Sequence, residues 1–94
     1  DYIELNEAFA SSTIASLRII AEQAGESYDS LLQRTNIHGS GISLGHPPGA
    51  TGAILTTKLM YEMKRNPDIR YGMVTMCVGG GHGFAAIWKK AGSN

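Results

Sequence analysis

Residues 71–88 read YGMVTMCVGGGHGFAAIW, and this stretch indicates the fold more clearly than any other part of the 94-residue chain. Residues 71–78 form a nearly continuous apolar run of strand-forming side chains, which is typical of a buried strand. Glycines dominate residues 79–83 and interrupt the run, and residues 84–88 then predict a returning strand that ends at two lysines. We therefore expect two neighbouring strands, the first of them inside the protein.

Upstream of this pair, residues 50–65 predict a helix, because apolar side chains line one side at helical spacing and charged side chains line another. The apolar side carries Leu55, Leu59 and Met63, and the charged side carries Lys58, Glu62 and Arg65. Asn66 and Pro67 end the helix, since proline restricts the residue before it to extended backbone.

The N-terminal part predicts a strand end at residues 2–5 followed by a first helix. Asn6 is the expected N-cap, Glu7 lies where the helix dipole favours an anion, and Gly25 is the expected C-terminal stop. The expected apolar face of this helix consists of Ala10, Ile14, Leu17, Ala21 and Ala24. A short helical turn follows at residues 30–33, and the glycine-rich residues 36–52 predict a loop.

The element order is therefore β-α-loop-α-β-β, which predicts the layered α/β class. Asp1 opens the chain without a methionine or a leader-like segment, and residues 2–5 resemble the middle of a domain. We expect that residues 1–94 are an incomplete portion of a longer protein and that the sheet continues into residues absent here.

Composition excludes several classes of function. Hydrophobic residues make up 43% of the chain and charged residues 17%, as in globular proteins. Eight basic residues balance eight acidic ones without a cluster of either sign, so nothing favours binding to nucleic acid or to an anionic membrane. The single cysteine excludes an internal disulfide and fits a reducing compartment.

His46 and Cys77 are the residues best suited to chemistry. His46 lies between Gly45 and Pro47, which hold its backbone extended, and an imidazole can take a proton from a thiol or polarise a carbonyl. Cys77 precedes three glycines whose N–H groups could form an oxyanion hole. From the residues alone, a Cys/His nucleophile pair competes with two plainer interpretations, a hydrogen-bonded loop histidine and an inert core cysteine.

Other interpretations carry less support. Asn6 can be a simple cap. The three histidines and Cys77 could bind zinc, but their spacing matches no recognised ligand pattern. The glycine-rich stretch before the second helix suggests a phosphate site, yet it lacks the Gly-Lys-Ser/Thr ending of a P-loop and does not continue into a dinucleotide fingerprint.

Taken together, three blocks resemble the thiolase family, and the resemblance runs from Asp1 to about residue 90. Residues 6–10 (NEAFA) resemble its NEAF block, and residues 36–47 (NIHGSGISLGHP) resemble its NxNGGxIALGHP block. Residues 77–83 (CVGGGHG) resemble its terminal CxGGGxG block. The departures include His38 in place of asparagine and Ser40 in place of glycine. The resemblance implies a portion of the C-terminal layered α/β domain of a thiolase.

The resemblance also implies a role for each matching residue. His46 corresponds to the histidine that activates a nucleophilic cysteine and helps to bind the thioester oxygen, and Asn6 to the asparagine that holds a water in the same oxyanion site. Cys77 corresponds to a second cysteine that removes or returns the α-proton of the acyl group. Gly79 corresponds to a glycine whose N–H contributes to the other oxyanion hole. The acylated nucleophile would then lie in an N-terminal half outside this chain, and Cys77 would be the acid/base group.

The implied activity is acyl transfer between acyl-CoA molecules, as a reversible Claisen condensation or as thiolysis of a 3-ketoacyl-CoA. The implied substrate is a coenzyme A thioester, with no cofactor, no cofactor-binding residue and no metal. The related 3-ketoacyl synthases typically use two histidines, and Cys77 favours the thiolase branch instead. We further expect the parent enzyme to be a homo-oligomer located in the cytoplasm, or in mitochondria or peroxisomes in a eukaryote. The alternative is a non-catalytic thiolase-like module used for association.

Overall fold

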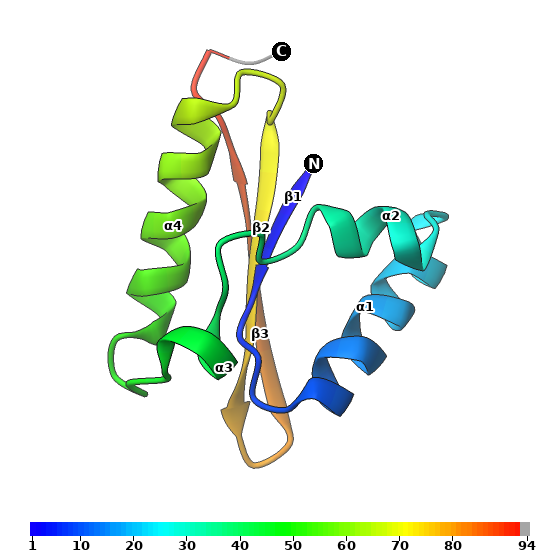
Figure 1. The fold of residues 1–94 in the computed structure, drawn as a ribbon, viewed down its shortest axis with the longest axis vertical. Coiled ribbons are helices and arrows are strands. Elements are labelled where there is room, and N and C mark those ends of the chain that lie inside the picture. The colour runs from blue at the N-terminus through cyan, green and yellow to red at the C-terminus, as the bar shows by residue number, and fades with distance from the viewer. Residues whose placement is uncertain (93–94) are drawn as a thin grey trace.

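The computed structural model describes residues 1–92, in which the strands form one mixed sheet (Figure 1). β1 (Tyr2–Leu5), β2 (Tyr71–Gly79) and β3 (His82–Lys89) follow the order β1-β2-β3. β1 runs parallel to β2, and β2 and β3 form an antiparallel hairpin. The layered α/β class and the predicted pair of neighbouring strands are confirmed.

The connection between the two parallel strands contains α1 (Ala10–Ala24), α2 (Tyr28–Gln33), α3 (Gly41–Leu44) and α4 (Thr51–Arg65). Figure 1 shows α1 and α2 on one side of the sheet and α4 on the other. One core lies under α4 and contains Tyr2, Leu55, Leu59, Met63, Ile69 and Val74. The second core lies under α1 and α2 and contains Ile3, Leu5, Leu17, Ala21 and Leu31.

β1 is the strand around which the molecule packs. Its side chains alternate between the two cores, so Tyr2 joins the α4 core and Ile3 joins the α1 core. Its outer edge is also covered, because the Ile3 N–H donates to the Arg34 carbonyl at 2.9 Å and the Asn36 N–H donates to the Ile3 carbonyl at 3.0 Å. All of β1 is therefore buried.

The start of α1 differs from the sequence prediction. Asn6 is not its N-cap, because Asn6 continues the strand and its N–H donates to the Thr75 carbonyl at 3.0 Å. The helix begins after Phe9, whose N–H donates to Ser12 Oγ at 3.2 Å. Its predicted end is confirmed, since Gly25 takes the left-handed conformation at φ 70°. Its predicted apolar face is buried at Leu17 and Ala21 but exposed at Ala10, Ile14 and Ala24.

Two further expectations are wrong in part. The glycine-rich segment is not a loop throughout, because α3 forms where Ser40 O accepts the Leu44 N–H at 2.7 Å. β2 is not buried along its length, because only Gly72 and Val74 are fully covered and its end, residues 77–79, is exposed. Cys77 lies in that exposed end of β2. Within residues 1–92 this excludes the interpretation of Cys77 as an inert core cysteine.

Candidate active site

The three motif segments meet at one end of the sheet, where the parallel strands β1 and β2 have their carboxyl ends. Asn6 directly follows β1, and Cys77 to Gly79 close β2. The loop with His46 leads into the N-terminus of α4, which Figure 1 shows at the same end as α3 and the β2–β3 turn. Ligands of open α/β sheets bind at this end of parallel strands.

Asn6 is the most buried of the four predicted site residues, with 5% of its surface exposed. Its Oδ1 is buried and makes no hydrogen bond within residues 1–92. Gly41 provides the space for this amide, because a Cβ at residue 41 would lie 2.8 Å from Asn6 Oδ1. A buried polar atom without a partner is costly, and a catalytic role or an ordered water is among the explanations for one.

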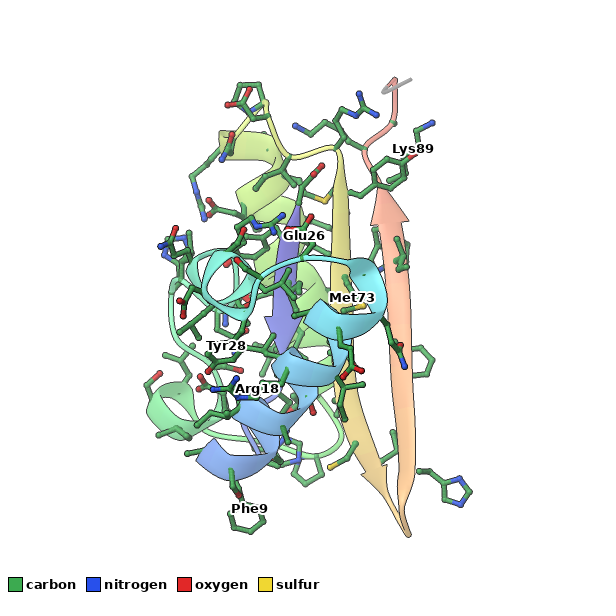
Figure 2. The ribbon with its side chains drawn as sticks, turned by 90° about the vertical axis from the view of Figure 1, so that its right-hand side faces the viewer. Phe9, Arg18, Glu26, Tyr28, Met73 and Lys89 are labelled. Carbon is green, nitrogen blue, oxygen red and sulfur yellow. The ribbon has the colours of Figure 1, made fainter. Side chains whose placement is uncertain are left out.

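Cys77 is exposed and lines a cavity of about 320 Å³ together with Asn6. Across the hairpin it pairs with Gly83, which has no side chain to cover the thiol. Other residues of this cavity include Ala8 and Phe9 from the turn between β1 and α1, and Ser12 from the first turn of α1. The phenyl ring of Phe9 itself extends outward from the end of α1 (Figure 2) and is 73% exposed. Cys77 and Asn6 thus share one open cavity.

Gly79 lies next to a bulge that shifts the strand register between Cys77 and the turn. Gly79, Gly80 and Gly81 have φ values of 92°, 60° and 78°, which side chains other than glycine rarely allow. The turn therefore needs these glycines for conformational reasons. The predicted oxyanion role of the Gly79 N–H remains a prediction.

His46 is exposed, and its ring is held by one contact: Nδ1 lies 2.6 Å from Thr51 Oγ1. Thr51 is buried in the first turn of α4, and its hydroxyl also donates to the Pro47 carbonyl at 2.9 Å. His46 does not line the cavity that contains Cys77. Its anchor Thr51 instead lines a second, small cavity of about 10 Å³, and Asn6 lines both cavities.

A buried ion pair lies behind this arrangement. Glu4 on β1 is fully buried, and its Oε1 is 3.1 Å from Lys58 Nζ on α4. Lys58 also donates to the carbonyl of Gly39, in the loop that leads to α3. Burial raises the pKa of the Glu4 carboxyl, and the neighbouring Lys58 ammonium opposes that rise. The pair therefore ties the strand before Asn6, helix α4 and the glycine-rich loop together.

Thr51, Glu4 and Lys58 were not among the site residues that the sequence predicted. Lys58 does lie on the predicted charged side of its helix, but nothing in the chain indicates a partner on a strand more than fifty residues away. The zinc interpretation is not supported, because no three His, Cys, Asp or Glu side chains among residues 1–92 gather closely enough to hold a metal ion. Nor is any helix in this part of the chain long and apolar enough to cross a membrane.

The fold and the grouped motifs define a protein of the thiolase-like α/β class. A family model described as "Thiolase, C-terminal domain" matches residues 1–90, and the chain belongs to this family.

Relatives agree with this membership. The chain is 46% identical over 90 residues to the beta-ketothiolase BktB of Cupriavidus necator, a match that covers 96% of this chain and 21% of the relative. The 3-ketoacyl-CoA thiolase of Bacillus subtilis is 43% identical over 86 residues, a match that covers 92% of this chain and 20% of the relative. The structure of an acetyl-CoA acetyltransferase from Syntrophomonas wolfei has a TM-score of 0.79 and 42% identity, covering 95% of this chain and 22% of that one. The chain thus spans about a fifth of the length of these relatives.

Proposed function

We propose that this chain contributes the acid/base part of a thiolase active site, for acyl transfer between CoA thioesters by Claisen condensation or by thiolysis of a 3-ketoacyl-CoA. The observation that supports it most is the cavity that Asn6 and Cys77 share at the carboxyl end of the parallel strands, next to the His46 loop. The nucleophilic cysteine that carries the acyl group comes from the rest of the thiolase chain. No cofactor or metal takes part.

In the condensation direction, His46 takes the proton of the nucleophilic thiol, which attacks one acyl-CoA and releases CoA. Cys77, as thiolate, then removes an α-proton from a second acyl-CoA. The carbanion attacks the acyl thioester, so a C–C bond forms, the C–S bond of the acyl-enzyme breaks, and the released thiolate regains a proton. Asn6 with its water and the Gly79 N–H stabilise the oxyanions that develop in these steps.

The test uses a complete thiolase chain that contains these residues. Cys77→Ala should lower condensation and thiolysis by about a hundredfold to ten-thousandfold, while the nucleophilic cysteine still becomes acylated. The exchange of acyl α-protons with deuterated water should be lost in the same variant. His46→Ala should instead slow acylation itself. Near-normal turnover of Cys77→Ala would refute the role of Cys77, and unchanged acylation in His46→Ala would refute that of His46.

A second candidate function is association without catalysis, and the exposed apolar side chains of the hairpin favour it. Phe84 and Ile87 of β3 are 56% and 71% exposed. Activity of the complete chain and its loss in Cys77→Ala separate the two candidates. We expect residues 1–94 alone to show no thiolytic activity, and turnover without any added chain would contradict the proposal that the nucleophile lies elsewhere.

A further inference from the structure

We infer that Thr51 is a positioning residue for His46, which it holds with the proton on Nδ1 so that the lone pair of Nε2 is free to act as the base. This inference rests on the proposed role of His46 and adds to it the nitrogen that reacts and the residue that selects it. It concerns a buried hydroxyl that the proposed mechanism does not otherwise use.

The hydrogen bonds of the Thr51 hydroxyl carry the argument. Oγ1 has a single proton, and it lies 2.9 Å from the Pro47 carbonyl oxygen and 2.6 Å from His46 Nδ1. The carbonyl oxygen can only accept, whereas a ring nitrogen can donate or accept. Both short contacts are satisfied together only when the hydroxyl donates to Pro47 and Nδ1–H donates to the hydroxyl. The neutral ring then has its lone pair on Nε2.

Thr51 is itself firmly held. It is 3% exposed, its backbone N–H donates to the same Pro47 carbonyl at 2.9 Å, and its β-branched side chain has few rotamers. His46, by contrast, is exposed and follows Gly45, which has a φ of 96°. The fold therefore fixes the Thr51 hydroxyl, and this hydroxyl in turn holds the His46 ring.

The arrangement also suits a base that is protonated and deprotonated in each cycle. In the imidazolium form Nδ1 still carries its proton and still donates to Thr51. Only Nε2 gains or loses a proton, so the ring does not have to turn between steps. A ring held in one orientation retains the geometry that proton transfer needs.

Three variants test this in the complete thiolase chain. Thr51→Val keeps the shape and removes the hydroxyl, Thr51→Ser keeps the hydroxyl, and Thr57→Val makes the same change at an exposed position of α4. Thr51→Val should slow acylation of the nucleophilic cysteine on the order of tenfold to a hundredfold, as loss of a histidine-orienting partner does at metal sites. Thr51→Ser should restore most of the rate, Thr57→Val should leave it unchanged, and KM should change less than kcat.

A second readout does not depend on activity. In this chain labelled with ¹⁵N, the imidazole resonances of His46, assigned with His46→Gln, should show the proton on Nδ1 in the wild type and in Thr51→Ser. In Thr51→Val the ring proton of His46 should redistribute towards Nε2. A wild-type ring protonated on Nε2, or unchanged acylation in Thr51→Val where His46→Ala is slow, would overturn the inference. If His46→Ala leaves acylation unchanged, the proposed function of His46 fails instead, and the ring resonances still report whether Thr51 holds it.

Discussion

At Glu62, an arginine and a histidine approach one carboxylate. Arg65 Nη2 is 2.7 Å and His38 Nε2 is 2.8 Å from its Oε2, and the hydrogen bonds from Arg65 and then His38 lower the pKa of Glu62. The folded state therefore releases this proton at a lower pH than the unfolded chain does. Its stabilising contribution is complete above a pH of about 4.5, the ordinary pKa, and is lost as pH falls through the folded-state pKa.

The Glu62→Gln variant should accordingly lose about 1 kcal/mol of unfolding free energy at neutral pH, the upper range for a pair that is partly open to solvent. The difference from the wild type should shrink as pH falls from about 5 to about 3. Urea unfolding of both proteins at several pH values measures this difference in unfolding free energy. Glu22→Gln, at an exposed position of α1, is the matched control. A difference that is the same at every pH would contradict the assignment.

The sequence singled out four candidate site residues: three lie beside or within backbone that glycine or proline constrains, and Asn6 was indicated by the resemblance of residues 6–10. Cys77 and Gly79 precede or belong to a turn of left-handed glycines, and His46 lies between a glycine and a proline. Thr51 could not be found in this way. Its importance depends on a hydroxyl that lies within 2.6 Å of a ring five residues earlier, a contact that exists only once the loop has folded against α4.

At the scale of elements, the Glu4–Lys58 pair joins β1 to α4, and its energy depends on both partners. In Lys58→Met the carboxylate of Glu4 stays fully buried without its cation, which typically costs about 3 to 5 kcal/mol. Glu4→Gln in the same chain removes the charge, so the double variant should recover most of that loss. Denaturant unfolding of the wild type, both single variants and the double variant gives the coupling energy.

The pH dependence of Lys58→Met offers an independent check. Burial already raises the pKa of Glu4, and loss of Lys58 removes the main opposing influence. A folded-state pKa above the unfolded value means that stability is present at low pH and is lost as pH rises through the folded-state pKa. The loss of unfolding free energy in Lys58→Met, relative to the wild type, should therefore be smallest near pH 4. Additive single effects, or a deficit that does not change with pH, would show that the pair is not coupled.

Gly72 marks a close approach between β2 and α4. A Cβ at residue 72 would overlap the buried side chain of Leu59, which is 0% exposed. Gly72→Ala should therefore destabilise the fold by about 1 to 3 kcal/mol. Gly83→Ala in the same sheet is the control, since a Cβ there meets no heavy atom within 4 Å. Leu59→Ala should relieve part of the strain in Gly72→Ala, and strictly additive losses in thermal unfolding would contradict the overlap.

The helices and the hairpin could be predicted from the periodicity of apolar residues. Where the structure differs from those predictions, the difference has a physical cause. α4 was predictable because its apolar and charged sides separate cleanly, and its residues Leu55, Leu59 and Met63 are all buried. The start of α1 was not, since an asparagine before a helix predicts a cap, whereas Asn6 forms a strand hydrogen bond to Thr75. That pairing joins residues nearly seventy positions apart, which local patterns do not indicate.

At the scale of the whole molecule, the helices cover only part of the sheet. α1 and α4 pack over β1 and the first half of β2, whereas β3 has exposed apolar side chains on both faces. The apolar run of β2 predicted burial on both faces, but the end of that strand, residues 77–79, is exposed within residues 1–92. Relatives about five times longer have further chain that could supply such cover, which supports the proposal that the complete active site includes other segments.

This exposed hairpin leads to a prediction about the chain in solution. Val78, Phe84, Ile87 and Trp88 are between 46% and 71% exposed, and β3 pairs only with β2 within the described residues. Apolar patches of this kind and free strand edges both favour contact between copies. Residues 1–94 alone should therefore self-associate, and solution scattering should give a radius of gyration above the 12.8 Å of the Cα trace that increases with concentration.

Two lysine substitutions test whether the hairpin is responsible. Ile87→Lys and Phe84→Lys place a charge on opposite faces of β3, and each should lower the association, because burying an unpaired ammonium group is unfavourable. Ile19→Lys makes a matched change at a 55% exposed position on α1 and should leave the association unchanged. If Ile19→Lys abolishes association and the hairpin variants do not, the contact lies on α1 instead. A wild-type chain that stays monomeric at every concentration would show that the exposed hairpin does not by itself drive association.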